Sequence, residues 1–242
     1  MTATIDTTTN RHAGTGLEVR DFAAYDFYKD IHKGIRFSLF QTTTAAGSVD
    51  PADDGARAVV VEQVRTIAHL LDSHAEHENT FIVPALETYA PELADVIHVV
   101  HPVLDRRVED LRGLAAEVQV TGGTRARAAV HSLYLELASF TSAYLEHQNF
   151  EERTCMYALA DAISVEELAG IEHQIIASIP PDEMAASLSV MFPAMNVDDR
   201  VELLVGIREG APLAVFAGIC ALAESVLTPE AWQATTTRLA LV

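Results

Sequence analysis

Histidine is the residue type that could carry chemistry in this chain of 242 residues. The sequence contains 10 His beside only 2 Cys and 1 Trp, and imidazole is the commonest metal ligand among side chains. In two segments a glutamate follows a histidine by four residues, in the pairs His74 with Glu78 and His147 with Glu151. This spacing stacks both side chains on one face of a helix, where they can reach the same ion.

The elements that must position these residues are predicted to be helices. Long stretches have a 3.6-residue hydrophobic repeat and almost none alternate strictly, which indicates an all-α fold. We expect long helices over about 21–44, 56–88, 91–118 and 125–162, separated by segments rich in helix breakers. Four long helices joined by three loops predict an antiparallel up-down four-helix bundle.

The last third of the chain is predicted to form an appendage of short helices, each with its own start signal. The signals are a capping box at Ser164 and Glu167, a break at Pro180 and Pro181, and N-caps at Asn196 and Thr228. A Thr-rich segment opens the chain and is predicted to be a disordered leader. The expected organisation is a leader over 1–20, the bundle over 21–163 and the appendage over 164–242.

The apolar stripe of each long helix contains one histidine, and two stripes add the glutamate. A buried imidazole or carboxylate without a partner costs several kcal/mol, so six such groups in one core predict a metal centre. Imidazole and carboxylate ligands suit iron, manganese or zinc and do not suit calcium or magnesium. Two carboxylates bridging two divalent ions would make a dinuclear site. The six candidate ligands are His32, His74, Glu78, His101, His147 and Glu151.

These residues resemble the hemerythrin-like, or HHE cation-binding, family over about 21–162. The resemblance rests on the pattern His, HxxxE, His, HxxxE, which includes the segments HAEHENTFIVPAL from His74 and HQNFEERTCMYAL from His147. It implies a four-helix bundle around a non-haem di-iron centre, with two iron ions in an Fe–O–Fe or carboxylate-bridged arrangement. It also implies that the six candidates are the iron ligands, with Glu78 and Glu151 as bridges.

The pattern differs from that of oxygen-carrying hemerythrins, which place two histidines four apart on the third helix and end on an aspartate. Here the segment HVVH places His98 and His101 three apart, and the last carboxylate is Glu151. This is similar to the bacterial iron-repair and iron-sensing branches, which use four histidines and two glutamates. His101 is the preferred ligand of the third helix, and His98 remains the alternative.

The resemblance implies a di-iron protein that binds, senses or reduces O2, NO or hydrogen peroxide, so its partner is a small diatomic or peroxide molecule. Two alternatives stay open: an iron storage or delivery protein, and a di-iron oxidase or oxygenase for which 164–242 would build a pocket for an organic substrate. Catalase-like consumption of peroxide and oxidase activity are both compatible with the site. The sequence names no catalytic residue.

Composition excludes several other classes of function. Lys and Arg number 16 against 35 Asp and Glu, a net charge of −19 that argues against nucleic-acid and anionic-membrane partners. The longest apolar run, Ala211 to Ala223, is shorter than the roughly 20 residues of a membrane span. With no secretion signal and no cysteine framework, we expect a cytoplasmic protein, as a monomer or a homodimer.

Other reactive side chains have simpler interpretations. Cys155 lies on the core stripe one turn beyond Glu151 and is interpreted as a buried hydrophobe rather than a redox group. Tyrosines near the site could hydrogen-bond a bound oxygen species or simply fill the core. His77 lies beside its stripe and could either orient Glu78 or a bound water or lie exposed at the rim. The tyrosines are Tyr25, Tyr28 and Tyr144, and the histidines placed off the stripes or in the leader are His12, His69, His131 and His173.

Overall fold

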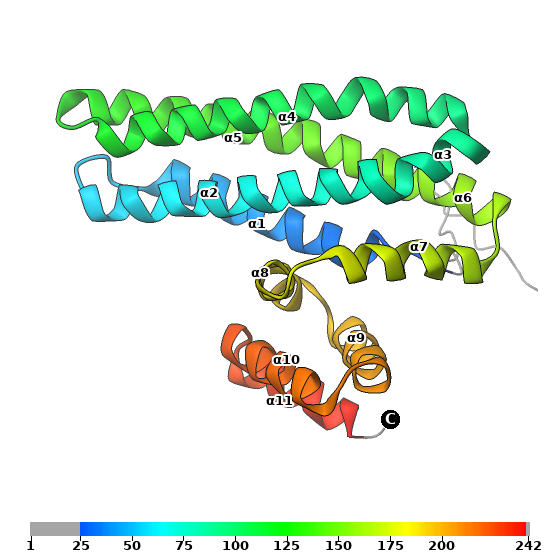
Figure 1. Ribbon diagram of the computed structural model, residues 1–242. Coiled ribbons are helices and arrows are strands. Elements are labelled where there is room, and N and C mark those ends of the chain that lie inside the picture. Colours follow the sequence, from blue (N-terminus) through cyan, green and yellow to red (C-terminus); the bar gives the residue numbers. More distant parts are fainter. Residues whose placement is uncertain (1–24, 241–242) are drawn as a thin grey trace, which may run out of the picture.

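The computed structural model describes residues 25–240, and every regular element in that range is a helix (Figure 1). The prediction of an all-α protein is confirmed for this part of the chain. The predicted leader over 1–20 lies outside the described residues.

Four long helices lie side by side and form the larger part of the structure (Figure 1). They are α1 (Lys29–Ser48), α2 (Asp54–His77), α4 (Pro91–Val120) and α5 (Thr124–Phe150). Helix α2 contacts α1 and α4, and α5 contacts the same two helices. Their apolar stripes meet in one buried core that includes Leu39, Val64, Leu111, Leu137 and Phe140. The histidine on each stripe is therefore directed towards the other three helices.

Hydrogen bonds from nearby side chains and one glycine turn define where these helices begin. The carboxylate of Asp26 accepts hydrogen bonds from the backbone N–H groups of Tyr28 and Lys29, at 3.0 and 3.2 Å. These bonds satisfy donors at the helix start, so α1 begins at Lys29 and not at the predicted position near residue 21. Asp53 caps α2 by accepting from Ala56 N at 2.9 Å. Gly123, with a φ of 59°, makes the turn into α5 that other residues rarely adopt.

Two of the predicted long helices are interrupted by π turns. Helix α2 passes into η1 (Glu78–Ile82) and then α3 (Val83–Tyr89), whereas the prediction ran unbroken over 56–88. Helix α5 passes into η2 (Glu151–Cys155) and then α6 (Met156–Ala162), whereas the prediction ran unbroken over 125–162. In each case a backbone N–H binds the carbonyl five residues back, that of Glu78 or of Glu151. The widened turns thus begin at the two candidate glutamates.

The rest of the chain forms five shorter helices: α7 (Val165–Ser178), α8 (Pro181–Ala194), α9 (Val197–Gly210), α10 (Leu213–Val226) and α11 (Pro229–Leu239). The predicted caps are confirmed: Ser164 and Glu167 form the capping box, and Asn196 and Thr228 cap α9 and α11. The apolar run noted in the sequence lies in α10, which has 14 residues. None of the described helices combines the length and the apolar character needed to cross a bilayer.

The shorter helices pack on the long ones through α8, which lies against α1 (Figure 1). Gly34 allows this close approach, because a Cβ atom there would meet the backbone N of Met191 at 3.2 Å. Ion pairs join α9 to α1, including Lys29 Nζ to Glu202 Oε2 at 2.8 Å. Met195 is buried in the core of the shorter helices, and Met184 and Met191 pack against that core. The shorter helices therefore stand next to the helix that carries His32.

Candidate metal centre

The structure brings all six candidate ligands together, from four different segments of the chain. One comes from α1, two from the junction of α2 with η1, one from the middle of α4, and two from the junction of α5 with η2. Every one of them is at most 8% exposed, although all six are polar. The six are His32, His74, Glu78, His101, His147 and Glu151.

One half of the cluster is formed by His32, His74 and Glu78. The Nε2 atoms of the two imidazoles lie 3.1 Å apart, and His74 Nε2 lies 3.2 Å from Glu78 Oε1. Two nitrogens bound to one ion at about 2.1 Å and at a right angle would be separated by about 3 Å. The spacing of these imidazoles thus suits two ligands of the same ion.

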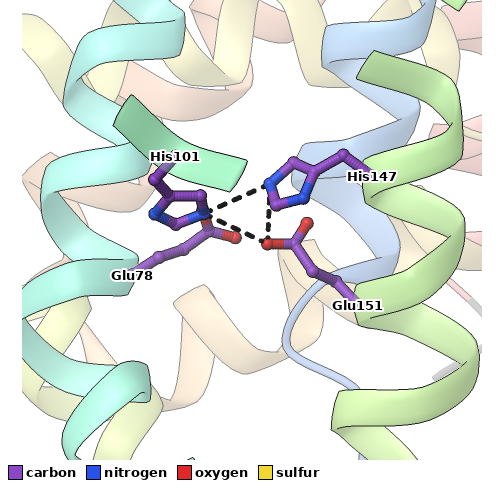
Figure 2. Close-up of side chains that lie close together, drawn as sticks. All are labelled: Glu78, His101, His147 and Glu151. Atoms are coloured by element: carbon purple, nitrogen blue, oxygen red, sulfur yellow. Dashed lines mark hydrogen bonds and ion pairs between the residues drawn. The ribbon is translucent and has the colours of Figure 1, made fainter. Parts of the chain in front are cut away.

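The other half is formed by His101, His147, Glu151 and, again, Glu78, as Figure 2 shows. The two imidazole Nε2 atoms are 3.2 Å apart. Glu151 Oε1 lies 3.0 Å from His147 Nε2 and 3.6 Å from His101 Nε2. This half repeats the arrangement of the first, with two nitrogens and a carboxylate oxygen converging on one point.

Each glutamate spans the two halves. Glu78 directs Oε1 towards His74 and Oε2 towards His101, the latter at 3.6 Å. Glu151 directs Oε1 towards His147, while its Oε2 lies 3.6 Å from His32 Nε2. Each pair of histidines consequently faces one oxygen of each carboxylate, which is the donor arrangement that two carboxylate-bridged ions require.

The carboxylates lack the partners that their burial demands. Both oxygens of Glu78 and Oε2 of Glu151 are buried without a hydrogen bond, and no Lys or Arg of the described residues forms an ion pair with either glutamate. Burying an uncompensated carboxylate costs several kcal/mol. A pair of divalent cations would supply the missing charge and the missing contacts, so the donor set fits a dinuclear metal centre.

In the metal-free site the pKa values of the two glutamates shift in opposite directions. Burial and the neighbouring charge of Glu151 raise the pKa of Glu78 well above its usual range. Burial also acts to raise the pKa of Glu151, but the adjacent imidazoles of His101 and His147 outweigh it and the net pKa falls below the ordinary value. Burial and the charge of His32 lower the pKa of His74. Without metal, these shifts favour the protonated form of Glu78 and the ionised form of Glu151.

A pH dependence of metal binding follows. We expect the apparent affinity for Fe2+ to rise with pH, by up to about tenfold per pH unit for each proton released. The raised pKa of Glu78 means that the ion must displace a proton there, whereas His74, with its lowered pKa, is already neutral near pH 7. Anaerobic titrations with Fe2+ at several pH values would measure this slope, and an affinity that falls with rising pH would contradict the assignment.

Two polar residues that the sequence interpretation did not single out orient the imidazoles. His32 Nδ1 donates to Glu152 Oε1 at 3.0 Å, and Arg36 Nη1 donates to the same oxygen at 2.6 Å. His101 Nδ1 donates to Asn79 Oδ1 at 2.7 Å. These bonds leave the Nε2 lone pairs directed into the cluster. The sequence offers one signal that could have identified Glu152 and Asn79: each directly follows a candidate glutamate.

Removing the charged hydrogen-bond acceptor of His32 is expected to lower the affinity for metal. Glu152→Gln should weaken metal binding about 10- to 100-fold, because loss of such a bond to a ligating histidine reduces its basicity and loosens its orientation. Glu146→Gln, on the exposed side of α5, is the matched control and should bind metal like the wild type. Competition with a chelator of known affinity measures both; equal affinities for the two variants would exclude an orienting role for Glu152.

The structure places only one of these two histidines of α4 in the cluster. His101 is 4% exposed and belongs to it, whereas the His98 side chain is 52% exposed and contacts Glu87 at 3.0 Å. His101, the preferred candidate, is the one whose side chain reaches the other candidate ligands.

This contrast gives a matched pair of variants. His101→Ala should lower the metal content by at least one ion per chain, because it removes one of the two imidazoles of its half. His98→Ala should keep the wild-type content, since the lost side chain is mostly solvated. Metal analysis of the two purified proteins distinguishes them, and the reverse ranking would move the ligand to His98.

The remaining reactive side chains surround the cluster or lie away from it. Tyr28 stacks on His32 with ring centroids 4.8 Å apart, and Tyr144 lies edge-on to His147. Cys155 is fully buried, and burial raises the pKa of its thiol to about 12, as expected for a small hydrophobe. Tyr25 instead bonds to Glu172. His69, His131 and His173 are exposed, His77 is half-buried, and His12 lies outside the described residues.

Comparison with known proteins gives one match. The family model described as hemerythrin HHE cation binding domain matches residues 23–159. This range covers more than half of the chain and contains all six residues of the cluster. No curated protein and no solved structure matches.

Proposed function

Because the chain belongs to the hemerythrin HHE cation-binding family, we propose that it is a non-haem di-iron protein that binds, senses or reduces O2, NO or hydrogen peroxide. The observation that carries the proposal is the placement of one oxygen of Glu78 and one of Glu151 at each pair of histidines. A pair of ferrous ions, when bound, supplies up to two electrons to a small oxidant.

The donor set supports iron over hard cations. Imidazole nitrogens with carboxylate oxygens suit iron, manganese and zinc, whereas calcium and magnesium prefer shells made entirely of oxygen. Two nitrogens and two carboxylate oxygens would serve each ion. Ions that take five or six ligands would keep positions open, as reactive sites do and purely structural sites do not.

The protein around the cluster favours a small ligand on one side. A void of about 10 Å³ adjoins the cluster, with His101, His147, Tyr144 and Leu104 among the residues that line it. This volume is near the minimum that holds one water molecule, so a diatomic molecule or peroxide is the size of guest that it favours. On this side of the cluster, apolar side chains of the core limit the access of bulk water.

The alternative of iron storage or delivery has less support, because the six ligands are at most 8% exposed and a cargo ion would need a route out. In the proposal α1, α2, α4 and α5 form the antiparallel up-down bundle of the family. We further propose a cytoplasmic protein, as a monomer or a homodimer. The net charge of −19 supports the absence of a nucleic-acid partner.

The test is metal content per chain after anaerobic purification, with the visible spectrum before and after exposure to air. We expect about two irons per chain and a spectrum that changes on air, as two sets of donors predict. His147→Ala should lose iron, whereas His131→Ala, exposed on the same helix, should keep it. Evolution of O2 from H2O2 and spectral titration with NO then distinguish peroxide consumption from ligand binding. No stoichiometric metal in the wild type would overturn the proposal.

A further inference from the structure

A second, much larger cavity adjoins the other half of the cluster. Its volume is about 360 Å³, within the roughly 300–1,000 Å³ of small-molecule sites. It lies between α1, α2 and η1 on one side and helices α7 to α10 on the other, where Figure 1 shows α7 and α8 beside the long helices. Tyr28, His74 and Glu78 form part of its wall. The void beside His101 and His147 is about 10 Å³, so the two halves of the centre face spaces of very different size.

Most of the wall is apolar, and the shorter helices supply much of it. Ile175 and Ile179 come from α7 and its end, Leu188 and Met191 from α8, and Ile207 from α9. A largely apolar cavity of this kind favours a ligand with an apolar body, since burying apolar surface is worth about 25 cal/mol per Å². A diatomic ligand would contact only a small part of this wall, so an organic molecule fits the cavity better.

The polar groups of the wall limit the charge of that molecule. Outside the cluster, the wall contains the carboxylates of Asp26, Asp30 and Glu172, and none of its residues is Lys or Arg. The Oδ1 atom of Asp30 is buried without a hydrogen bond, and Lys33 Nζ is 3.8 Å away, beyond hydrogen-bond distance. The wall thus repels an anion and offers an acceptor to a hydroxyl or an ammonium group.

We propose that this cavity binds an organic molecule with an apolar body and a hydroxyl or amine end, and that it holds the molecule beside the His74 and Glu78 side of the centre. The cavity exists without metal, but its role as a site for an organic partner of the centre rests on the proposed function. In this arrangement the shorter helices complete the wall that α1 and α2 leave open.

Binding can be measured on the full metal-free chain with the uncharged fluorescent probe N-phenyl-1-naphthylamine. We expect saturable binding of one probe per chain. Decanol and decylamine should displace the probe at concentrations at least about tenfold lower than decanoate, because the wall is acidic. Asp30→Asn should weaken displacement by decylamine more than displacement by decanol. Absence of saturable binding, or equal displacement by decanoate, would overturn the proposal.

Two substitutions of the same type locate the probe. Ala211→Phe places a ring in the cavity and should weaken probe binding at least about tenfold, whereas Ala234→Phe, at an exposed position of α11, should leave it unchanged. Circular dichroism checks that both variants fold, and the ranking of the three decyl compounds on the wild type needs no variant.

Iron-loaded protein then tests the position of the ligand. Addition of decanol should change the visible spectrum of the wild type and leave that of Ala211→Phe unaltered. Probe binding without any spectral change would remove the claim that the molecule lies beside the centre. If the chain binds the probe but takes up no iron, the cavity is a binding site and the di-iron function is wrong. Failure of the cavity proposal and failure of the proposed function are therefore distinguishable.

Discussion

Glu78→Gln should reduce the iron content from about two ions per chain to one or none. Glu78 belongs to both groups of candidate ligands, with one oxygen directed towards each pair of histidines. Glutamine keeps the shape of the side chain but removes the negative charge and one of the two donor oxygens. Neither half of the site would keep its charge balance, and metal analysis with the visible spectrum would show the loss directly.

The metal-free Glu78→Gln protein should behave in the opposite way and be at least as stable as the metal-free wild type. Burial and the charge of Glu151 raise the pKa of Glu78 and favour its neutral form in the metal-free fold, so glutamine should remove little favourable charge. Glu76→Gln, exposed on the same helix, is the control and should keep both iron and stability. A Glu78→Gln variant with full iron content would exclude Glu78 as a bridge.

Removal of metal should lower the melting temperature by about 8–16 °C for each occupied site. A ligand at about 1,000 times its Kd stabilises the folded state by about 4 kcal/mol, and 1 kcal/mol shifts Tm by about 2–4 °C in a chain of this length. The physical source is the set of unpartnered buried carboxylate oxygens, which the ions neutralise in the folded state alone. Calorimetry of iron-loaded protein before and after anaerobic chelation measures the shift.

The ligand variants check that the shift arises at this centre. His98→Ala should lose as much stability on chelation as the wild type, because its side chain is mostly solvated. His147→Ala should show a much smaller shift, since half of the centre is already impaired. Identical shifts in all three proteins would place the stabilising metal elsewhere.

Helix type and the inward residues were predictable because they depend on periodicity along one chain segment. A 3.6-residue repeat identifies a helix, and a histidine in phase with apolar neighbours must face the same side as they do. The four-residue spacing of His74 with Glu78 and of His147 with Glu151 required no knowledge of other helices. The caps at Ser164, Asn196 and Thr228 are local for the same reason.

The π turns were missed because they change the backbone without changing the hydrophobic pattern enough to detect. Proline explains η1 in part, since Pro84 has no N–H to donate four residues back. Within η2 there is no proline, and the feature that the two turns share is an initial glutamate at the metal cluster. Both π turns therefore coincide with a requirement of the tertiary structure, which is the placement of Glu78 and Glu151 between the histidine pairs.

Periodicity and spacing within single helices thus accounted for the helical class, the cluster residues and the local caps, because each depends on neighbours a few residues away. Packing between helices decided everything else: His101 over His98, the outward partners Glu152 and Asn79, and the cavity closed by α7 to α10. His98 and His101 are three positions apart and lie on nearly the same face of α4, so packing against α5 decided which of them joins the cluster. Distances between segments far apart in the chain have no signature in a local repeat, and they arise only when the core is assembled.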